Sequence, residues 1–180
     1  MSRYLSDCCS LINLYCGFGS IQILHEIGDQ WHIGDKALDE AKYSRDLDAS
    51  GQPLRVDLTP TILQGQYPLS VLSMMSTEEN ALFVELAKIM GDGEAQAFVL
   101  ANSKSLPLLI DDYAAIKGAT RSGLNVSTIS TPEILISWAA NDNTRQGRLP
   151  GIVGRIDKLA KFCPHKTSPH LAWWQSMLVQ

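Results

Sequence analysis

The stretch LLIDDYAAIKGATRSGLNVSTISTPE, residues 108–133, contains the alternation of strand and helix that sets the fold class. Its first three residues, 108–110, form an apolar run of the length expected for a buried strand. A helical pattern follows over 114–121, and residues 126–129 form a second strand-like segment. Thr131 and the proline after it are typical of the start of another helix. Strands that alternate with helices in this way predict a parallel sheet covered by helices on both faces.

The rest of the chain continues this alternation on both sides of the stretch. Further strands are expected at 4–5, 30–33 and 69–72, and further helices at 10–15, 21–27, after Asp35, after the Ser76-x-x-Glu79 capping box, and after Gly93. By contrast, residues 43–66 are polar and rich in turn-forming residues, so we expect an irregular excursion that holds a short helix near Thr59. The predicted fold class is α/β.

The pattern changes near the end of the chain, where a polar break precedes an amphipathic helix over 152–162 and the tryptophan pair 173–174. We predict a body formed by residues 1–140 and a helical extension, 141–180, that packs on it. From residue 143 onward the chain has six Lys and Arg and one Asp, a net charge of +5. The whole chain carries −4, which leaves −9 for the remainder. This asymmetry fits a metal-binding body beside a phosphate-facing surface, and a solvated helix face would give the same composition.

The composition is that of an ordinary globular protein, with 45% hydrophobic and 19% charged residues. No stretch approaches the roughly 20 apolar residues that a membrane-spanning helix needs. The acidic residue at position 7 comes too early for a signal peptide. We therefore expect a cytoplasmic protein with no membrane contact. The four cysteines lack the paired spacing of a zinc site, and no disulfide framework is expected.

Acidic residues occupy the positions at which an open parallel sheet binds ligands, outside the carboxyl ends of its strands. Asp7 follows the first predicted strand, and Asp111 and Asp112 follow the strand quoted at the outset. Glu94 lies in the first turn of the helix before that strand, and Glu40 lies on the helix after the second strand. Carboxylates gathered at one edge repel one another, and a hard divalent cation such as Mg²⁺ or Mn²⁺ relieves the repulsion.

Each acid also has an ordinary structural explanation. Asp7 and the Asp111–Asp112 pair are typical helix caps, and the two glutamates suit a helix start and an exposed surface. A haloacid-dehalogenase-type phosphatase is excluded, because it needs an aspartate where Cys9 stands. A dinucleotide-binding protein needs a glycine-rich turn directly after the first strand, which this chain lacks. A response-regulator receiver stays open, although its acidic pair is expected near the start of the chain.

Three segments of the sequence resemble PIN domains. Residues 4–14, YLSDCCSLINL, resemble the opening of that fold, in which a strand ends in an aspartate and an asparagine follows within a helix. GDGEAQA at 91–97 and LLIDD at 108–112 resemble its second half, and 126–135 is similar to its final strand and helix. The matches cover roughly residues 3–140. They imply a three-layer α/β sandwich with a central, mostly parallel sheet flanked by helices.

The resemblance implies a metal-dependent nuclease, and many bacterial PIN domains are RNA-cleaving toxins of type II toxin–antitoxin pairs. The acids that it assigns to catalysis are Asp7, Glu40, Glu94 and Asp112, and those that it assigns to Mg²⁺ or Mn²⁺ are Asp7, Glu94, Asp111 and Asp112. Asn13 is expected to support them, and Asp39 is a neighbouring match for Glu40. The implied partners are single-stranded RNA, an antitoxin protein and a second copy of the chain in a homodimer.

A PIN-fold module that binds nucleic acid or protein with little or no catalysis is the alternative interpretation. The two interpretations differ in whether the acids converge, since a nuclease needs Glu40 and Glu94 to point towards Asp7. A receiver-like regulator would instead need a lysine at the end of the last strand, where Ser130 and Thr131 stand.

Overall fold

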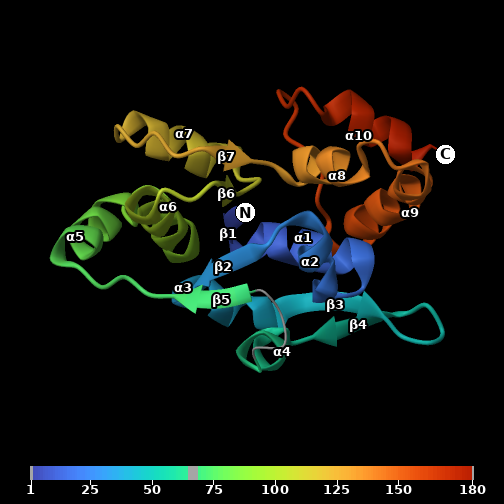
Figure 1. Ribbon diagram of the computed structural model, residues 1–180, viewed down its shortest axis with the longest axis horizontal. Helices are drawn as coiled ribbons and strands as arrows, with labels where there is room; N and C mark the ends of the chain where they lie inside the picture. The colour runs from blue at the N-terminus through green and yellow to red at the C-terminus, as the bar shows by residue number, and fades with distance from the viewer. Residues whose placement is uncertain (1, 65–68, 180) are drawn as a thin grey trace.

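The structure, a computed structural model that describes residues 2–64 and 69–179, has a five-stranded parallel sheet at its centre (Figure 1). The strands lie in the order β5-β2-β1-β6-β7, and every neighbouring pair in this sheet is parallel. Their bounds are Arg3–Ser6 for β1, Gln30–Gly34 for β2, Leu69–Leu72 for β5, Leu108–Leu109 for β6 and Thr128–Ile129 for β7. Helices cover both faces, so the predicted α/β class and three-layer arrangement are confirmed.

Helices occupy the connections between the strands, as parallel pairing requires. Before β5 they are α1 (Cys8–Phe18), the short turn η1 (Ile21–Ile23), α2 (Leu24–Ile27), α3 (Asp35–Leu38), the short turn η2 (Asp39–Tyr43) and α4 (Thr59–Leu63). After β5 they are α5 (Thr77–Leu86), α6 (Asp92–Lys104), α7 (Tyr113–Arg121), α8 (Thr131–Ala139), α9 (Asn143–Ala160) and α10 (Leu171–Leu178). In the described part of the chain, none of them combines the length and the apolar character that a membrane crossing requires.

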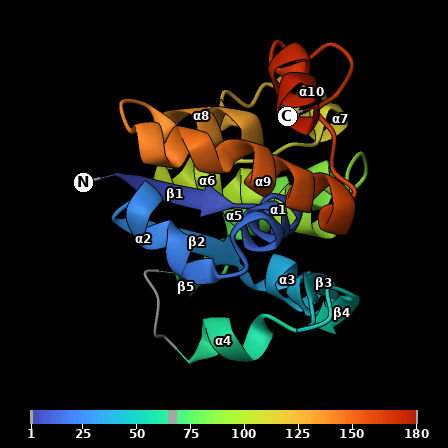
Figure 2. The same cartoon turned by 90° about the vertical axis from the view of Figure 1, so that its right-hand side faces the viewer.

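Side chains that alternate along each strand build a separate apolar cluster on each face of the sheet. In β1, Tyr4 packs against the cluster that α1, α8 and α9 cover, whereas Leu5 belongs to the cluster beneath α6 and α7. Figure 2 shows α9 and α1 in front of the sheet and α5 and α6 behind it. Trp31 is fully buried on the first face and Phe98 on the second. The sheet is therefore buried on both sides, as the apolar runs of its strands predicted.

The polar composition of the segment 43–66 predicted an irregular excursion. The structure instead has an antiparallel hairpin in this segment. β3 (Ser44–Leu47) pairs with β4 (Pro53–Val56), and Asp48 accepts the N–H groups of Ser50 and Gln52 in the turn, both at 2.9 Å. The prediction was wrong because these strands are largely exposed and lack the apolar run by which buried strands are identified. The short helix expected near Thr59 is α4, and positions 65 and 66 lie outside the described residues.

The C-terminal helices are built into the main core. Ile152 and Ile156 of α9 pack on α1, and Gly17 makes room for them: a methyl group at Gly17 would lie 2.9 Å from the side chain of Ile152. Trp174 of α10 is fully buried and meets Phe162 edge to face, with ring centroids 5.1 Å apart. One half of the tryptophan pair thus closes the core instead of facing a partner.

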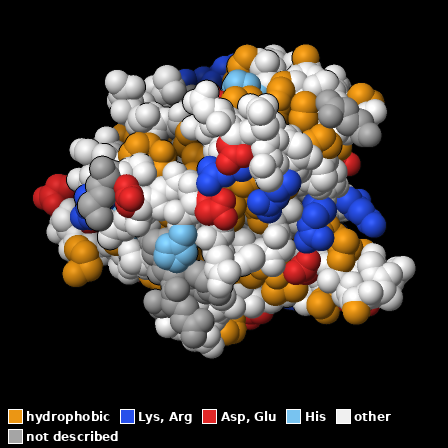
Figure 3. Space-filling model, turned by 45° about the vertical axis from the view of Figure 1, so that its right-hand side comes forward, with side chains coloured by type: hydrophobic (Ala, Val, Ile, Leu, Met, Phe, Trp, Pro, Cys, Tyr) orange, Lys and Arg blue, Asp and Glu red, His pale blue; other side chains and the backbone are white. Residues whose placement is uncertain are grey.

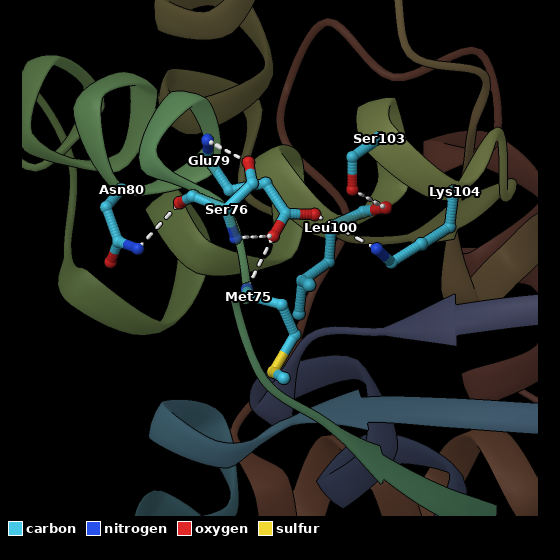
Figure 4. A network of polar contacts seen from close by, with 7 residues as sticks. All are labelled: Met75, Ser76, Glu79, Asn80, Leu100, Ser103 and Lys104. Atoms are coloured by element: carbon cyan, nitrogen blue, oxygen red, sulfur yellow. Dashed lines mark hydrogen bonds and ion pairs between the residues drawn. The ribbon is translucent and has the colours of Figure 1, made fainter.

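The capping box expected at the start of α5 is present and also ties α5 to α6 (Figure 4). The Glu79 carboxylate accepts the backbone N–H of Met75 at 2.6 Å and of Ser76 at 3.1 Å, and the Lys104 ammonium near the end of α6 lies 3.1 Å away. Hydrogen bonds from Ser103 and from these groups lower the pKa of Glu79 to about 2. A charged anchor therefore fixes α6, the helix whose first turn carries acids of the candidate site.

Candidate metal centre at the carboxyl edge of the sheet

Asp7 and Asp111 lie at neighbouring strand ends, where the order of the strands reverses. β1 and β6 are parallel neighbours with Ser6 opposite Leu109, and the Asp7 N–H donates to the Leu109 carbonyl at 3.0 Å. The chain runs from β1 outward through β2 to β5 and then returns to β6 on the other side of β1. Open α/β sheets bind ligands at such a switch point, outside the carboxyl ends of the strands. The topology therefore brings these two acids to the expected place.

Asp7 is buried, with 3% of its surface exposed, and it caps α1 by accepting the Ser10 N–H at 2.8 Å. The pKa of the Asp7 carboxyl is raised from 3.8 to about 7, and burial is the largest cause of the rise. The charges of Asp111 and Glu94 add to the effect of burial, whereas the hydrogen bonds from Ser10 oppose it. Asp7 can therefore be both a helix cap and a member of the acidic site. It caps α1, and it does so at a buried position where its ionisation is unfavourable.

Asp111 is held by four hydrogen bonds from three residues. Its Oδ2 atom accepts from Ser10 Oγ and Asn13 Nδ2, both at 3.0 Å, and from the Thr131 hydroxyl, while Oδ1 accepts the Thr131 N–H at 2.8 Å. Burial raises the pKa of Asp111, and the hydrogen bonds oppose the rise. The amide of Asn13 fixes the orientation of this carboxylate. Oδ1 accepts only one of these four hydrogen bonds, so it has a free lone pair with which to bind a cation.

Asp112 is turned to α7 instead of the centre. It is exposed and caps that helix, accepting the Ala115 N–H at 2.9 Å. The resemblance to PIN domains assigned Asp112 to catalysis and metal, with Asp111 beside it. The structure brings Asp111, and not Asp112, to Asp7, because the second of the two neighbours has the extended backbone of a helix N-cap, with φ −73° and ψ 101°.

Two glutamates approach the pair from other elements. Glu94, partly buried in the first turn of α6, contributes to the raised pKa of Asp7. Glu40, in η2, lies over the start of α6: a methyl group on Gly93 would lie 2.8 Å from Glu40 Oε1. Burial raises the pKa of Glu40, and the charges of Glu94 and Asp92 raise it further. Both glutamates therefore belong to the same negative centre as Asp7.

Asp39 and Glu40, the two adjacent acids after β2, differ in their surroundings. The Asp39 side chain is 83% exposed and pairs with Lys42 at 3.8 Å. Its neighbour Glu40 is the acid whose charge reaches the centre. Of these two adjacent acids, Glu40 is therefore the one that lies at the start of α6.

Three residues of the centre were not predicted: Ser10, Asp92 and Thr131. Asp92 stands two residues before Glu94 in the same first turn, so a carboxylate count over that turn would have found it. Thr131 follows the last strand of the sheet, which puts it at the same edge as the aspartates. Ser10 gave no signal in the sequence, since a serine in the first turn of a helix is common.

The negative field of the centre acts on Cys9, which is next to it on α1. Loss of solvation and the charges of four acids, Asp7, Glu40, Glu94 and Asp111, together raise the pKa of the Cys9 thiol to about 12, although the residue is exposed. Cys9 therefore stays a protonated thiol at neutral pH and is not poised as a nucleophile. The four acids come from four segments of the chain, and the charge of each of them acts on this one thiol.

The donor set of the centre fits a hard divalent cation. Among the described residues, no three His, Cys, Asp or Glu side chains form a ready-made metal site. Asp7, Glu94 and Asp111 nevertheless offer the oxygen ligands that Mg²⁺ and Mn²⁺ take. A cation among them would offset the burial and the like charges that raise the pKa of Asp7. With such a cation, the arrangement can activate water and stabilise charge on a phosphate.

A cleft opens beside the acids between α1, the β3–β4 hairpin and the end of α9. Its volume is about 240 Å³, and it is lined by Cys9 and Asn13 together with Tyr43, Arg45 and Lys161. Figure 3 shows Lys and Arg side chains, with acidic side chains among them, from the centre of one face to its right edge. The basic residues of α9 are Arg145, Arg148, Arg155 and Lys158. Cations that adjoin an acidic centre suit a chain of phosphates, because they can contact the phosphates next to the reacting one.

Comparisons with protein-family models, with curated proteins and with solved structures give no match to this chain. The α/β architecture is shown by the structure itself. The similarity to PIN domains therefore rests on the three sequence segments alone, and a function based on it is a proposal.

Proposed function

We propose that this protein is a Mg²⁺- or Mn²⁺-dependent nuclease that cleaves phosphodiester bonds of single-stranded RNA. The observation that carries the proposal is that four acids from four segments of the chain act electrostatically on one another or on the same neighbouring thiol. They are Asp7, Glu40, Glu94 and Asp111. Gathering like charges lowers the stability of a fold, so a site that keeps them favours a ligand of opposite charge.

In this proposal Asp7, Glu94 and Asp111 would hold the cation. When bound, the cation activates water and stabilises the charge that develops on the phosphate. The proposal requires the cation to draw the carboxylates closer, because without it their repulsion keeps them apart. Asn13 and Thr131 keep Asp111 oriented through the hydrogen bonds described above. Glu40, which is exposed, would be able to reach a substrate or a water molecule.

RNA is proposed as the substrate because the acid-bearing segments resemble PIN domains, many of which are bacterial toxins that cleave RNA. The basic residues of α9 and the cleft that contains Arg45 and Lys161 support a polyanionic substrate. On the same resemblance we propose a cytoplasmic toxin that acts as a homodimer and is inhibited by an antitoxin protein.

Incubation of the purified protein with a mixed pool of single-stranded RNA tests the proposal. The RNA should be cut with Mg²⁺ or Mn²⁺ and should stay intact with a chelator. Glu94→Gln, which removes a charge and keeps the shape, should lower the cleavage rate by about a hundredfold or more. Glu85→Gln is the matched control, since Glu85 is an exposed residue of α5 that pairs with Lys88 at 2.7 Å.

Cleavage that survives the chelator, or that Glu94→Gln leaves intact, would contradict the assignment of the acids. Single-stranded DNA of the same sequences tests the choice of RNA, which requires the DNA to be cut more slowly. If folded protein binds RNA and leaves it intact in every condition, the PIN-fold binding module becomes the better description.

A further inference from the structure

Two arginines lie directly opposite each other on the β3–β4 hairpin. Arg45 of β3 and Arg55 of β4 are partners in the antiparallel register, and both are exposed. Partners of this kind project to the same face of the hairpin with their Cβ atoms about 5 Å apart, and like charges in these positions destabilise the strand pair. The hairpin therefore carries a charge arrangement that opposes its own folding.

Neither guanidinium is neutralised by a carboxylate. Within residues 2–64 and 69–179, no ion pair includes Arg45 or Arg55. The Arg55 guanidinium lies over the Tyr43 ring, 4.7 Å from the ring centroid. This contact with the ring holds the cation in position and leaves it free to bind an anion.

The hairpin is fixed to the body of the protein through its neighbouring residues. Asp46 of β3 accepts the Tyr15 hydroxyl at 3.0 Å and pairs with Arg155 of α9 at 2.8 Å. Side chains alternate along a strand, so Asp46 anchors one face of β3 and Arg45 is on the other. The two unpaired arginines are thus carried by a strand whose position relative to α1 and α9 is set.

The arginines stand at a cleft that leads to the acid centre. The hairpin lies next to α1 and the end of α9 (Figure 2), and Arg45 and Tyr43 line the cleft between them. Asn13 is on the wall of the same cleft and donates to Asp111 Oδ2 at 3.0 Å. The cleft is therefore continuous with the carboxylates.

Lys161 adds a third cation to this cleft. It ends α9 with φ 59° and ψ 30°, in the left-handed region where glycine is the usual residue. Among the described residues, no ion pair includes Lys161 either. A lysine in this conformation is less favourable for the backbone than a glycine, so two features at one cleft keep cations where the fold alone does not favour them.

We propose that the β3–β4 hairpin is an arm that holds the sugar–phosphate backbone of the substrate strand, with Arg45, Arg55 and Lys161 as its phosphate-binding cations. The inference rests on the proposed nuclease function, because the cleft leads from these cations to the acids. Contacts of this kind position a strand and read no base sequence. An acidic protein segment would meet the same cations, but only a phosphodiester strand gains from a cleft that ends at the proposed cleavage site.

Binding of an oligouridylate of about ten nucleotides tests the arm, measured by fluorescence anisotropy with a chelator present so that the RNA stays intact. Arg45→Gln and Arg55→Gln should each weaken binding by about tenfold, since a hydrogen bond to a charged group contributes this much. Each should also reduce the slope of log affinity against log salt by about 0.7, the value for one phosphate contact of a single strand. An abasic ribose-phosphate chain of the same length should bind within about threefold of oligouridylate, because the arm contacts the backbone.

Thermal unfolding of the same variants separates binding from a structural role. Arg45→Glu places a carboxylate opposite Arg55, so it should raise the unfolding midpoint by roughly 1 to 4 °C while it weakens RNA binding more than Arg45→Gln does. Lys161→Gly should unfold at the same temperature or higher and should also bind RNA more weakly. The matched controls are Arg121→Gln and Arg121→Glu, because Arg121 is an exposed arginine at the end of α7, on the other face of the sheet.

The proposal is overturned if Arg45→Gln and Arg55→Gln weaken RNA binding no more than Arg121→Gln does. It is also overturned if a polyglutamate peptide of about ten residues displaces the RNA at equal concentration, since guanidinium groups bind carboxylates as well and the arm would then fit an acidic protein segment. The readout is independent of cleavage. Failure of the nuclease proposal alone gives intact RNA with the binding differences retained, whereas failure of the arm gives cleavage that Arg45→Gln leaves unchanged.

Discussion

Replacement of Asp7 by asparagine should lower the rate of RNA cleavage by at least about a thousandfold, since a catalytic cation contributes several kcal/mol and each factor of ten corresponds to about 1.4 kcal/mol. The substitution removes one negative charge at the point where the strand order reverses. Asparagine keeps the shape of the side chain and caps helices well, so α1 should stay folded. The cleavage rate with Mn²⁺, measured at saturating RNA, is the quantity to compare.

Asp142→Asn is the matched control for this substitution. Asp142 also caps a helix, α9, by accepting the Arg145 N–H at 3.0 Å, and its charge is not among those that act on Asp7. The control should cleave RNA at close to the rate of the natural protein. If Asp7→Asn did the same, Asp7 would be a helix cap and no more.

The second large effect is on stability, and it has the opposite sign. Above pH 7, Asp7→Asn should raise the free energy of unfolding of the metal-free protein by about 2 to 4 kcal/mol. The ordinary pKa of the carboxyl is 3.8 and its folded-state pKa is about 7. Between these values the folded state holds a proton that the unfolded state has lost, so stability falls as the pH rises. Asparagine does not ionise and escapes this loss.

Thermal unfolding with a chelator present, at about pH 5 and about pH 8, measures the effect. The midpoint of Asp7→Asn should exceed that of the natural protein by roughly 5 to 15 °C at the higher pH, as expected for a chain of this length. The gap should narrow at the lower pH, where the buried Asp7 of the natural protein is protonated. An equal gap at both pH values would show that the ionisation of Asp7 does not limit stability.

The sequence was sufficient for the parts of the fold that are buried. The strands expected at 30–33 and 69–72 are β2 and β5 with nearly the same bounds. The apolar residues of β2 are buried between two layers of helices, and β5 is an edge strand whose apolar residues are buried or partly buried. The β3–β4 hairpin was missed for the complementary reason. It is largely exposed, so its residues are not selected for an apolar pattern, and only its turn at Asp48 left a signal.

The sequence predicted which segments of the chain form the candidate site, but it did not predict which side chain of each segment faces the site. Asp7 and Asp111 were expected at one edge because both follow strands, and the strand order brings them together. Which of Asp111 and Asp112 faces the centre depends on one backbone turn after β6, and adjacent acids give no sequence signal for that choice. The pairing of Arg45 with Arg55 depends on the register of the hairpin, which the sequence did not predict.

Binding of Mn²⁺ to chelator-treated protein, followed by isothermal titration calorimetry above pH 7, tests most directly whether these acids hold a divalent cation. The natural protein should bind Mn²⁺, and Asp7→Asn and Asp111→Asn should each weaken the affinity by about tenfold or more. Asp112→Asn should have a much smaller effect, because Asp112 is exposed and its charge is not among those that act on Asp7. If the natural protein binds no Mn²⁺, or if Asp7→Asn and Asp111→Asn bind it as tightly as the natural protein, the metal centre is contradicted.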